Sequence, residues 1–180
     1  MRTVLLLMLA PVLAGKAGAQ TAHLAPANAP SRITIADSTE PGTRLVVSGR
    51  VLGADNKPVP SASIYVYHTD DKGEYVPGSN AGMDRPRLLG YLRSDSEGRY
   101  SFATIRPAPY PNSRIPAHVH FEIAPPGYQG RIYEIMFEGD PLITSQVRGQ
   151  ALVPFGPIVI VEPRTTRLGV IQVTHDILVR

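Results

Sequence analysis

The chain has 180 residues, enough for one domain of ordinary size, and 43% of them are hydrophobic, so a full core needs no covalent cross-links. It contains no cysteine, which excludes disulfides, thiolate metal sites, a cysteine nucleophile and a lipid-anchor cysteine. The formal net charge is only +3 and the basic residues are scattered, so we expect no nucleic-acid surface. Any metal must therefore be held by nitrogen and oxygen ligands.

The first 19 residues have the features of a cleavable signal peptide. Arg2 provides a positive start, residues 4–13 form a short apolar run, and Ala17-Gly18-Ala19 is a small-residue cleavage site. The apolar run is shorter than the ~20 residues that a bilayer-spanning helix needs. We therefore expect cleavage after Ala19 and a mature protein without a membrane span, located in the periplasm or secreted.

Residues 20–43 are rich in Ala, Pro, Ser and Thr and have no sustained periodicity. This composition predicts a linker or an arm on the surface, with one short strand near Ile33 and Ile35. A single folded domain is expected over residues 44–180.

That domain consists of short predicted strands and turns. In residues 62–67, for example, small or apolar side chains alternate with a serine and two tyrosines, which is the period of a strand with two distinct faces. No stretch has convincing helical periodicity with caps, and 18 prolines and 16 glycines interrupt the chain. The pattern favours an all-β fold, an antiparallel β-sandwich, over a parallel α/β sheet. The predicted strands cover residues 45–51, 62–67, 100–105, 119–123, 133–137, 158–161 and 169–179.

Two histidines in one predicted strand are the first candidate site residues. Residues i and i+2 of a strand point the same way, so His118 and His120 should present two imidazoles on one face while the residues between and after them face the core. Two neutral imidazoles can converge on one ion, although such pairs on strands are more often surface or hydrogen-bonded histidines. Their surroundings favour a site: Tyr110 lies upstream between two prolines that fix its backbone, and Tyr75 ends the turn after an earlier strand.

Ordered sequence blocks extend from Gly49 to Asp140 around these four residues. The blocks are Gly49-Arg-Val, Lys57-Pro-Val-Pro60, Ile64 to His68 with Asp70 to Tyr75, Ser94 to Pro107 with Tyr110-Pro111, and Pro116 to Phe121 with Phe137 to Pro141. In this order they resemble the catalytic core of the intradiol ring-cleavage dioxygenases, the catechol and protocatechuate type. The end of the chain, from Asp176 to Arg180, resembles that family's closing strand.

The resemblance implies that Tyr75, Tyr110, His118 and His120 bind one ferric ion, Fe(III). Anionic phenolate oxygens suit this hard cation and help to keep it ferric. The resemblance further implies that a small aromatic diol and O2 are the substrates, and that the diol displaces Tyr110, which takes up a substrate proton. The ring would be cleaved between its two hydroxyl-bearing carbons to a muconate-type diacid. The implied catalytic residues are Tyr110 and, as the candidate for an arginine of the family, Arg114.

Three positions depart from the family pattern. The family usually has an arginine three residues before its first histidine ligand, where this chain has Ile115. Arg114 is one residue earlier, and on an extended strand that slip reverses the side chain, so Arg114 substitutes only if the loop bulges. Glu134 stands where catechol-type members carry a glutamine, and it either adds negative charge beside the substrate or faces solvent. The third departure is the lack of a counterpart to the helical N-terminal region of the catechol-type enzymes, which makes the layout resemble a compact protocatechuate-type subunit or an exported single-subunit branch.

Two alternative functions stay open. The turn pattern from Gly49 to Tyr100 is also that of transthyretin-like sandwiches, which would make the protein an exported, non-catalytic binding module. The other alternative is an iron-binding relative with altered chemistry, suggested by Ile115 and Glu134. The sequence specifies neither the substrate nor the oligomeric state, and it leaves room for a homo-oligomer. His68 is expected at the rim of the fold, and His175 as a surface pair with Asp176.

Overall fold

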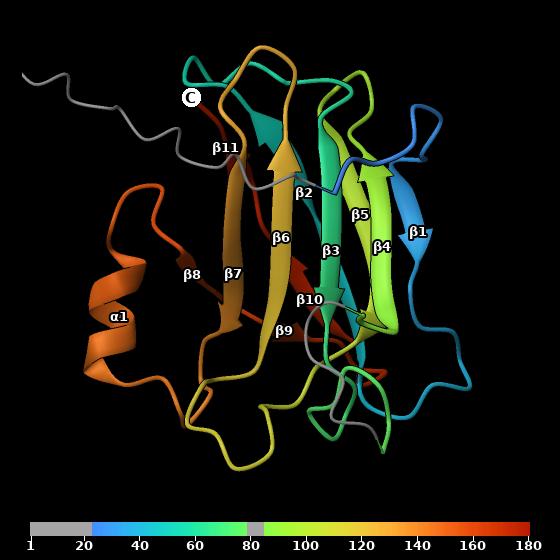
Figure 1. Ribbon diagram of the computed structural model, residues 1–180, viewed down its shortest axis with the longest axis vertical. Helices are drawn as coiled ribbons and strands as arrows, with labels where there is room; N and C mark the ends of the chain where they lie inside the picture. The colour runs from blue at the N-terminus through green and yellow to red at the C-terminus, as the bar shows by residue number, and fades with distance from the viewer. Residues whose placement is uncertain (1–22, 79–84) are drawn as a thin grey trace, which may run out of the picture.

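The computed structural model describes residues 23–78 and 85–180, so the predicted signal peptide lies outside the described residues. Two β-sheets pack face to face, and one short helix lies at the edge of the front sheet (Figure 1). In the described residues, one sheet has the strand order β1–β5–β2–β10–β9, with β11 also beside β2, and the other has the order β4–β3–β6–β7–β8. The strands are β1 (Arg32–Thr34), β2 (Arg44–Leu52), β3 (Ser63–His68), β4 (Leu88–Arg93), β5 (Arg99–Ile105), β6 (His118–Ala124), β7 (Arg131–Phe137), β8 (Ile158–Val161), β9 (Arg164–Thr165), β10 (Ile171–Thr174) and β11 (Ile177–Leu178), and the helix is α1 (Ser145–Ala151).

The predicted β-sandwich is confirmed, but its sheets are mixed rather than wholly antiparallel. The central pairs β2–β5, β3–β4, β3–β6 and β6–β7 are antiparallel. The pairs β1–β5, β2–β10, β2–β11 and β7–β8 are parallel. Side-chain alternation predicts which face of a strand is buried, whereas strand direction depends on the connections between strands. The connection through α1 brings β8 back alongside β7 in the same direction (Figure 1).

Several elements differ from the sequence prediction. The predicted strand 169–179 is two strands, β10 and β11, which are separated at His175 and Asp176. Two strands, β4 and β9, and the helix α1 were not predicted. The helix has seven residues, none of them buried, so it has no apolar stripe from which to predict it. Its Thr144 N-cap accepts a hydrogen bond from the Val147 amide, the local interaction that starts the helix.

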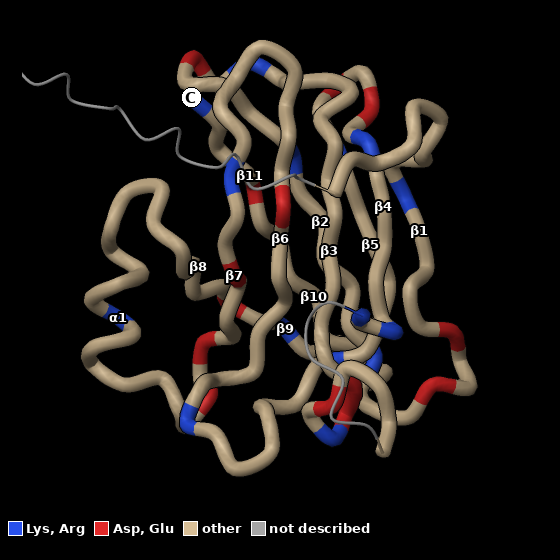
Figure 2. The backbone as a smooth tube through the Cα atoms, viewed as in Figure 1, with Lys and Arg blue, Asp and Glu red and all other residues tan. Residues whose placement is uncertain are grey.

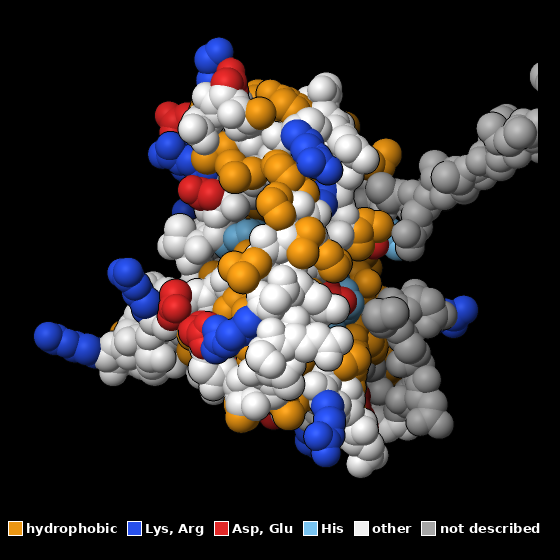
Figure 3. Space-filling view, turned by 90° about the vertical axis from the view of Figure 1, so that its left-hand side faces the viewer, with side chains coloured by type: hydrophobic (Ala, Val, Ile, Leu, Met, Phe, Trp, Pro, Cys, Tyr) orange, Lys and Arg blue, Asp and Glu red, His pale blue; other side chains and the backbone are white. Residues whose placement is uncertain are grey.

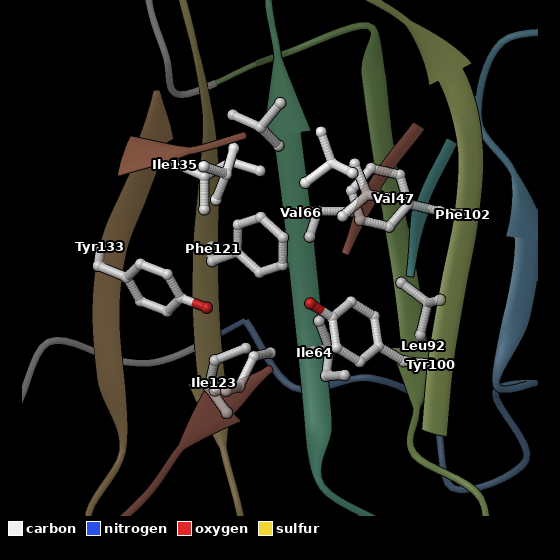
Figure 4. Packing of buried hydrophobic residues seen from close by; sticks show 14 of the residues in the cluster. Val47, Ile64, Val66, Leu92, Tyr100, Phe102, Phe121, Ile123, Tyr133 and Ile135 are labelled. Atoms are coloured by element: carbon white, nitrogen blue, oxygen red, sulfur yellow. The ribbon is translucent and has the colours of Figure 1, made fainter. Parts of the chain in front are cut away.

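The core lies between the sheets and is built from the inward side chains of both. Phe121 on β6 is fully buried and stacks on Tyr133 of the neighbouring strand, with ring centroids 5.3 Å apart. From the opposite sheet, Tyr100 and Phe102 meet the same ring at 6.3 Å and 5.9 Å. Figure 4 shows these side chains pointing toward one another between the two layers. The core therefore anchors β6, the strand that carries the paired histidines.

The described part of the predicted arm packs against the sandwich. Strand β1 pairs with β5, so the sheet begins before residue 44. Ile33 and Ile35 pack against the core, and Ala25 is buried. A Cβ on Gly90 of β4 would collide with the end of Ile33, so this glycine makes room for the arm.

Charged residues lie mostly in loops and at strand ends, while the middles of the strands are largely uncharged (Figure 2). On the side that includes α1 and β8, acidic and basic side chains are interspersed among hydrophobic ones (Figure 3). Across residues 23–78 and 85–180, no helix has the length and apolar character needed to cross a membrane.

Candidate metal centre

Strand β6 presents His118 and His120 on the face of the sheet that points away from the sandwich core. Both are only 5% exposed, while Val119 and Phe121 are fully buried on the core side. The alternation expected from the sequence is thus confirmed. The start of β6 is held by Asp140, whose Oδ2 accepts a hydrogen bond from the Ala117 amide at 3.1 Å.

Tyr75 reaches the histidines through a tight turn after β3. The Asp70 carboxylate accepts hydrogen bonds from the Lys72 and Glu74 amides, both at 2.9 Å, which closes the turn. Gly73 within it has φ of 83°, in the left-handed region, and a Cβ there would collide with the Pro109 carbonyl. Glycine therefore permits both the turn conformation and its close approach to the segment before Tyr110.

Two hydrogen bonds join this turn to the segment that carries Tyr110. The Ala108 amide donates to the Asp70 carbonyl at 3.0 Å, and the Thr69 hydroxyl donates to the Ala108 carbonyl at 2.8 Å. The two tyrosines are 35 residues apart in sequence, and these contacts bring them together.

The four predicted ligand atoms converge on one point. The Tyr75 and Tyr110 hydroxyl oxygens are 2.6 Å apart, and the Nε2 atoms of His118 and His120 are 3.1 Å apart. The Tyr75 oxygen lies 2.9 Å from His120 Nε2, and the Tyr110 oxygen lies 3.0 Å from His118 Nε2 and 3.3 Å from His120 Nε2. Donors that share one ion at about 2.0–2.2 Å are separated by comparable distances.

The other nitrogen of each imidazole has an acceptor beside it. His118 Nδ1 lies 2.7 Å from the Pro116 carbonyl, so Nδ1 carries the proton and Nε2 presents a lone pair. His120 Nδ1 lies 3.4 Å from Glu134 Oε1, which favours the same tautomer. Two lone pairs then face each other, and the tyrosine protons or a bound cation can satisfy both.

The electrostatics of the site suit a cation. Burial, and next the nearby His118, lower the pKa of His120 to about 3, so its imidazole is neutral. Burial also raises the pKa of Tyr75 well above its ordinary value, and it raises that of Tyr110. Both phenols therefore stay protonated unless a bound cation stabilises the phenolate. Two imidazoles and two phenols form a donor set that fits a hard, highly charged ion such as Fe(III).

Arg114 is the predicted catalytic residue that is outside this cluster. It is exposed, in the irregular segment between Tyr110 and β6, where Asn112 has φ of 60°. No hydrogen bond or ion pair within the described residues involves its side chain. The segment is a loop, so the argument from an extended strand does not apply to Arg114 or to Ile115, which is 45% exposed. The catalytic role of Arg114 stays a prediction.

Glu134 lies near the cluster, opposite His120 in the register of β6 and β7. Its side chain is 31% exposed, and its carboxylate contacts an imidazole. The sequence left two alternatives for Glu134, a place beside the site or contact with solvent. The structure shows both features.

Two other histidines were placed wrongly by the sequence prediction. His68 is 1% exposed, not at the rim, and its ring nitrogens meet the Thr69 carbonyl and the Thr104 hydroxyl, both at 2.7 Å. His175 is 7% exposed, and its Nε2 lies 2.8 Å from the Tyr133 hydroxyl. The alternation of side chains along a strand could have predicted this burial. His68 is on the same face as Ile64 and Val66, and His175 is on the same face as Val173 and Ile177.

Comparisons with known proteins identify the family. The sequence profile of a family described as dioxygenase matches residues 18–156. The chain is 33% identical over 125 residues to catechol 1,2-dioxygenase 2 of Acinetobacter lwoffii, covering 59% of this chain and 44% of the relative. It is 31% identical over 170 residues to chlorocatechol 1,2-dioxygenase of Rhodococcus opacus, covering 83% of this chain and 61% of the relative. The chain thus spans only part of the length of these curated relatives.

A solved structure has the same fold. It is the dioxygenase domain of a dioxygenase carbohydrate-binding protein fusion from Streptomyces sp. SirexAA-E, with a TM-score of 0.63 and 24% identity, covering 84% of this chain and 88% of that chain. Because the family profile covers most of the sequence and the relatives it resembles are catechol and chlorocatechol 1,2-dioxygenases, the chain belongs to the intradiol ring-cleavage dioxygenase family.

Proposed function

We propose that the protein is a non-haem Fe(III) dioxygenase that cleaves a catechol-type ring between its two hydroxyl-bearing carbons. The observation that carries this proposal is the convergence of two phenol oxygens and two imidazole nitrogens, with neighbouring donor atoms 2.6–3.3 Å apart. A non-catalytic, transthyretin-like module would have no need for these four groups in one place. The family of the chain supports the same activity.

In the proposed reaction, Tyr75, His118 and His120 would hold the metal throughout. They are buried, whereas Tyr110 is partly exposed and is therefore the ligand that a diol can replace. The Tyr110 phenolate then takes up one substrate proton at its hydroxyl oxygen. Bound ferric iron would supply a Lewis acid that orients the diol and makes its ring reactive toward O2. One carbon–carbon bond breaks, each of its carbons becomes a carboxyl carbon, and both oxygen atoms of O2 remain in the diacid product.

The visible spectrum of the purified, iron-loaded protein tests this proposal. We expect one iron per chain, a tyrosinate-to-iron charge-transfer band, and a change in that band when catechol is added without O2. Admission of 18O2 should then place both labelled atoms in one diacid product, which we would seek with catechol, hydroxyquinol and protocatechuate. A colourless, iron-free protein after iron-replete expression would exclude the proposed activity.

An iron protein with altered chemistry is the second candidate. It is favoured by the exposure of Arg114 and by Ile115 at the position of the family's usual arginine. The same experiment separates the two candidates. Bound iron and a diol-dependent spectrum, without oxygen uptake on any catechol, would support the altered chemistry.

We also propose export of the mature chain, on the basis of the sequence pattern of residues 1–19. Expression of the full-length chain in a bacterial host should yield protein in the periplasm or medium whose N-terminal residue is Gln20. Protein that stays in the cytoplasm with Met1 intact would contradict this.

A further inference from the structure

The imidazoles of the metal centre are held in two different ways. His118 Nδ1 meets a main-chain carbonyl, that of Pro116, at 2.7 Å. The corresponding atom of His120 lies 3.4 Å from Glu134 Oε1. The main-chain carbonyl beside His118 would remain if residue 116 were changed, whereas the acceptor beside His120 is the side chain of Glu134.

Strand register places that carboxylate beside His120. Three strands lie side by side here, and Tyr67 on β3, His120 on β6 and Glu134 on β7 are register partners. Tyr67 stacks on the imidazole with a centroid distance of 4.4 Å and an interplanar angle of 9°. The ring is thus covered on a face by Tyr67 and contacted at its Nδ1 edge by Glu134.

We propose that Glu134 is a positioning residue for His120. This inference rests on the proposed iron site. The Glu134 carboxylate oxygen, 3.4 Å from Nδ1, favours a proton on that nitrogen, which keeps the Nε2 lone pair directed at Tyr75, Tyr110 and His118. Glu134 is close enough to His118 and His120 for one atom of each residue to share a metal ion. Its contact is nevertheless with the imidazole nitrogen that faces away from the cluster, so it acts through His120.

The carboxylate also changes the charge of the site. A ferric ion with two phenolates keeps one positive charge, which a carboxylate held against a ligand offsets. A glutamine, the residue of catechol-type members at this position, could accept the same proton through its amide oxygen but would leave that charge. Glu134 should therefore stabilise Fe(III) relative to Fe(II) more than a glutamine does.

The tautomer can be measured without metal. In the iron-free protein, 15N NMR of the histidine rings should show His120 protonated at Nδ1 in the wild type and in Glu134→Gln. Glu134→Leu removes the acceptor and should raise the share of the Nε2-protonated form. The matched control is Glu122→Gln, because Glu122 lies on the same face of β6 but contacts His23 rather than His120. An unchanged His120 tautomer in Glu134→Leu would overturn the positioning role.

Iron binding separates the effects of geometry and charge. Chelator competition should show an affinity loss of about 10- to 100-fold for Glu134→Leu and a smaller loss for Glu134→Gln. The Fe(III)/Fe(II) potential should rise in both variants and stay unchanged in Glu122→Gln. Wild-type affinity and potential in both Glu134 variants would overturn the inference while leaving the iron site intact. Absence of iron in the wild type would instead remove the proposed function, and the NMR result would still report on the contact.

Discussion

Three of the four donor side chains of the proposed metal centre each contact a specific neighbouring group. His118 has a carbonyl beside its Nδ1, the His120 ring stacks on Tyr67 and lies 3.4 Å from Glu134, and Tyr75 follows a turn that closes through a carboxylate. The two tyrosines differ in burial, because Tyr75 is 7% exposed and Tyr110 is more open. This difference in burial fits the two proposed roles, a permanent ligand for Tyr75 and a ligand that substrate replaces for Tyr110.

Phenylalanine substitutions test this difference. Tyr75→Phe should weaken iron binding by more than the roughly 10- to 100-fold typical of an outer-shell change, because it removes an anionic ligand. Tyr110→Phe should also lose part of the charge-transfer band, and adding catechol should restore most of its iron binding, since the diol occupies that position. Chelator competition with and without catechol measures both effects.

Tyr91→Phe is the control for both variants, because its hydroxyl makes no hydrogen bond among the described residues. It should retain the spectrum and the iron affinity of the wild type. Equal behaviour of the Tyr75 and Tyr110 variants in the presence of catechol would contradict the assigned roles.

Among the elements, the turn after β3 and the segment before β6 matter most for the site, although neither is regular secondary structure. The turn approaches Pro109 so closely that only a glycine fits at position 73. The hydrogen bonds of Asp70 and Thr69 with Ala108 then fix the turn that ends at Tyr75 against the segment that leads to Tyr110. Strand β6 supplies the histidines from the other side, fixed by its core-facing residues.

Gly73→Ala should damage the site more than a matched glycine change elsewhere. Gly127 also has positive φ, 77°, but a Cβ there meets nothing within 4 Å. Gly127→Ala should therefore cost only the backbone penalty, about 1–2 kcal/mol in the free energy of unfolding. Gly73→Ala adds the collision with Pro109, so we expect a larger loss of stability together with weaker iron binding.

Urea denaturation and chelator competition measure the two glycine variants. If Gly73→Ala and Gly127→Ala lose equal stability and both bind iron as the wild type does, the close approach at Gly73 is unimportant for the site.

At the scale of the whole molecule, two buried histidines make the stability of the sandwich depend on pH. Burial lowers the pKa of His68 to about 4, and burial followed by the charge of Arg131 lowers that of His175 to about 4. Both are neutral in the folded protein but gain a proton near pH 6.5 when unfolded. Their contribution to stability is complete above pH 6.5 and is lost as the pH falls toward 4, because the unfolded state then binds more protons.

Because of each of these histidines, the free energy of unfolding should be about 2 kcal/mol lower at pH 5 than at pH 8. His175→Gln tests one of them: it should be less stable than the wild type at pH 8, and the difference should narrow by about 2 kcal/mol at pH 5. Urea denaturation of the iron-free proteins at both pH values gives the comparison. A difference that is the same at both pH values would mean that His175 titrates normally in the folded state.

Much of the fold and the donor set can be read from local sequence patterns. Alternation predicted most of the long strands and the two faces of β6, because the period of a strand is a property of the backbone. The resemblance of the ordered blocks to the intradiol ring-cleavage dioxygenases predicted which four side chains belong together. Helix α1 and strand β4 were missed, since a seven-residue helix with no buried residue and a glycine-containing strand carry little periodic signal.

What the sequence does not specify depends on contacts between distant segments. Strand direction at the sheet edges, the burial of His68 and His175, and the contact of Glu134 with His120 all arise when separate strands become neighbours. The same holds for the 2.6 Å approach of Tyr75 to Tyr110, which requires a turn and a loop to pack together. Residue type and spacing identify the groups that can bind a metal, whereas three-dimensional packing determines their tautomers, their burial and the distances between them.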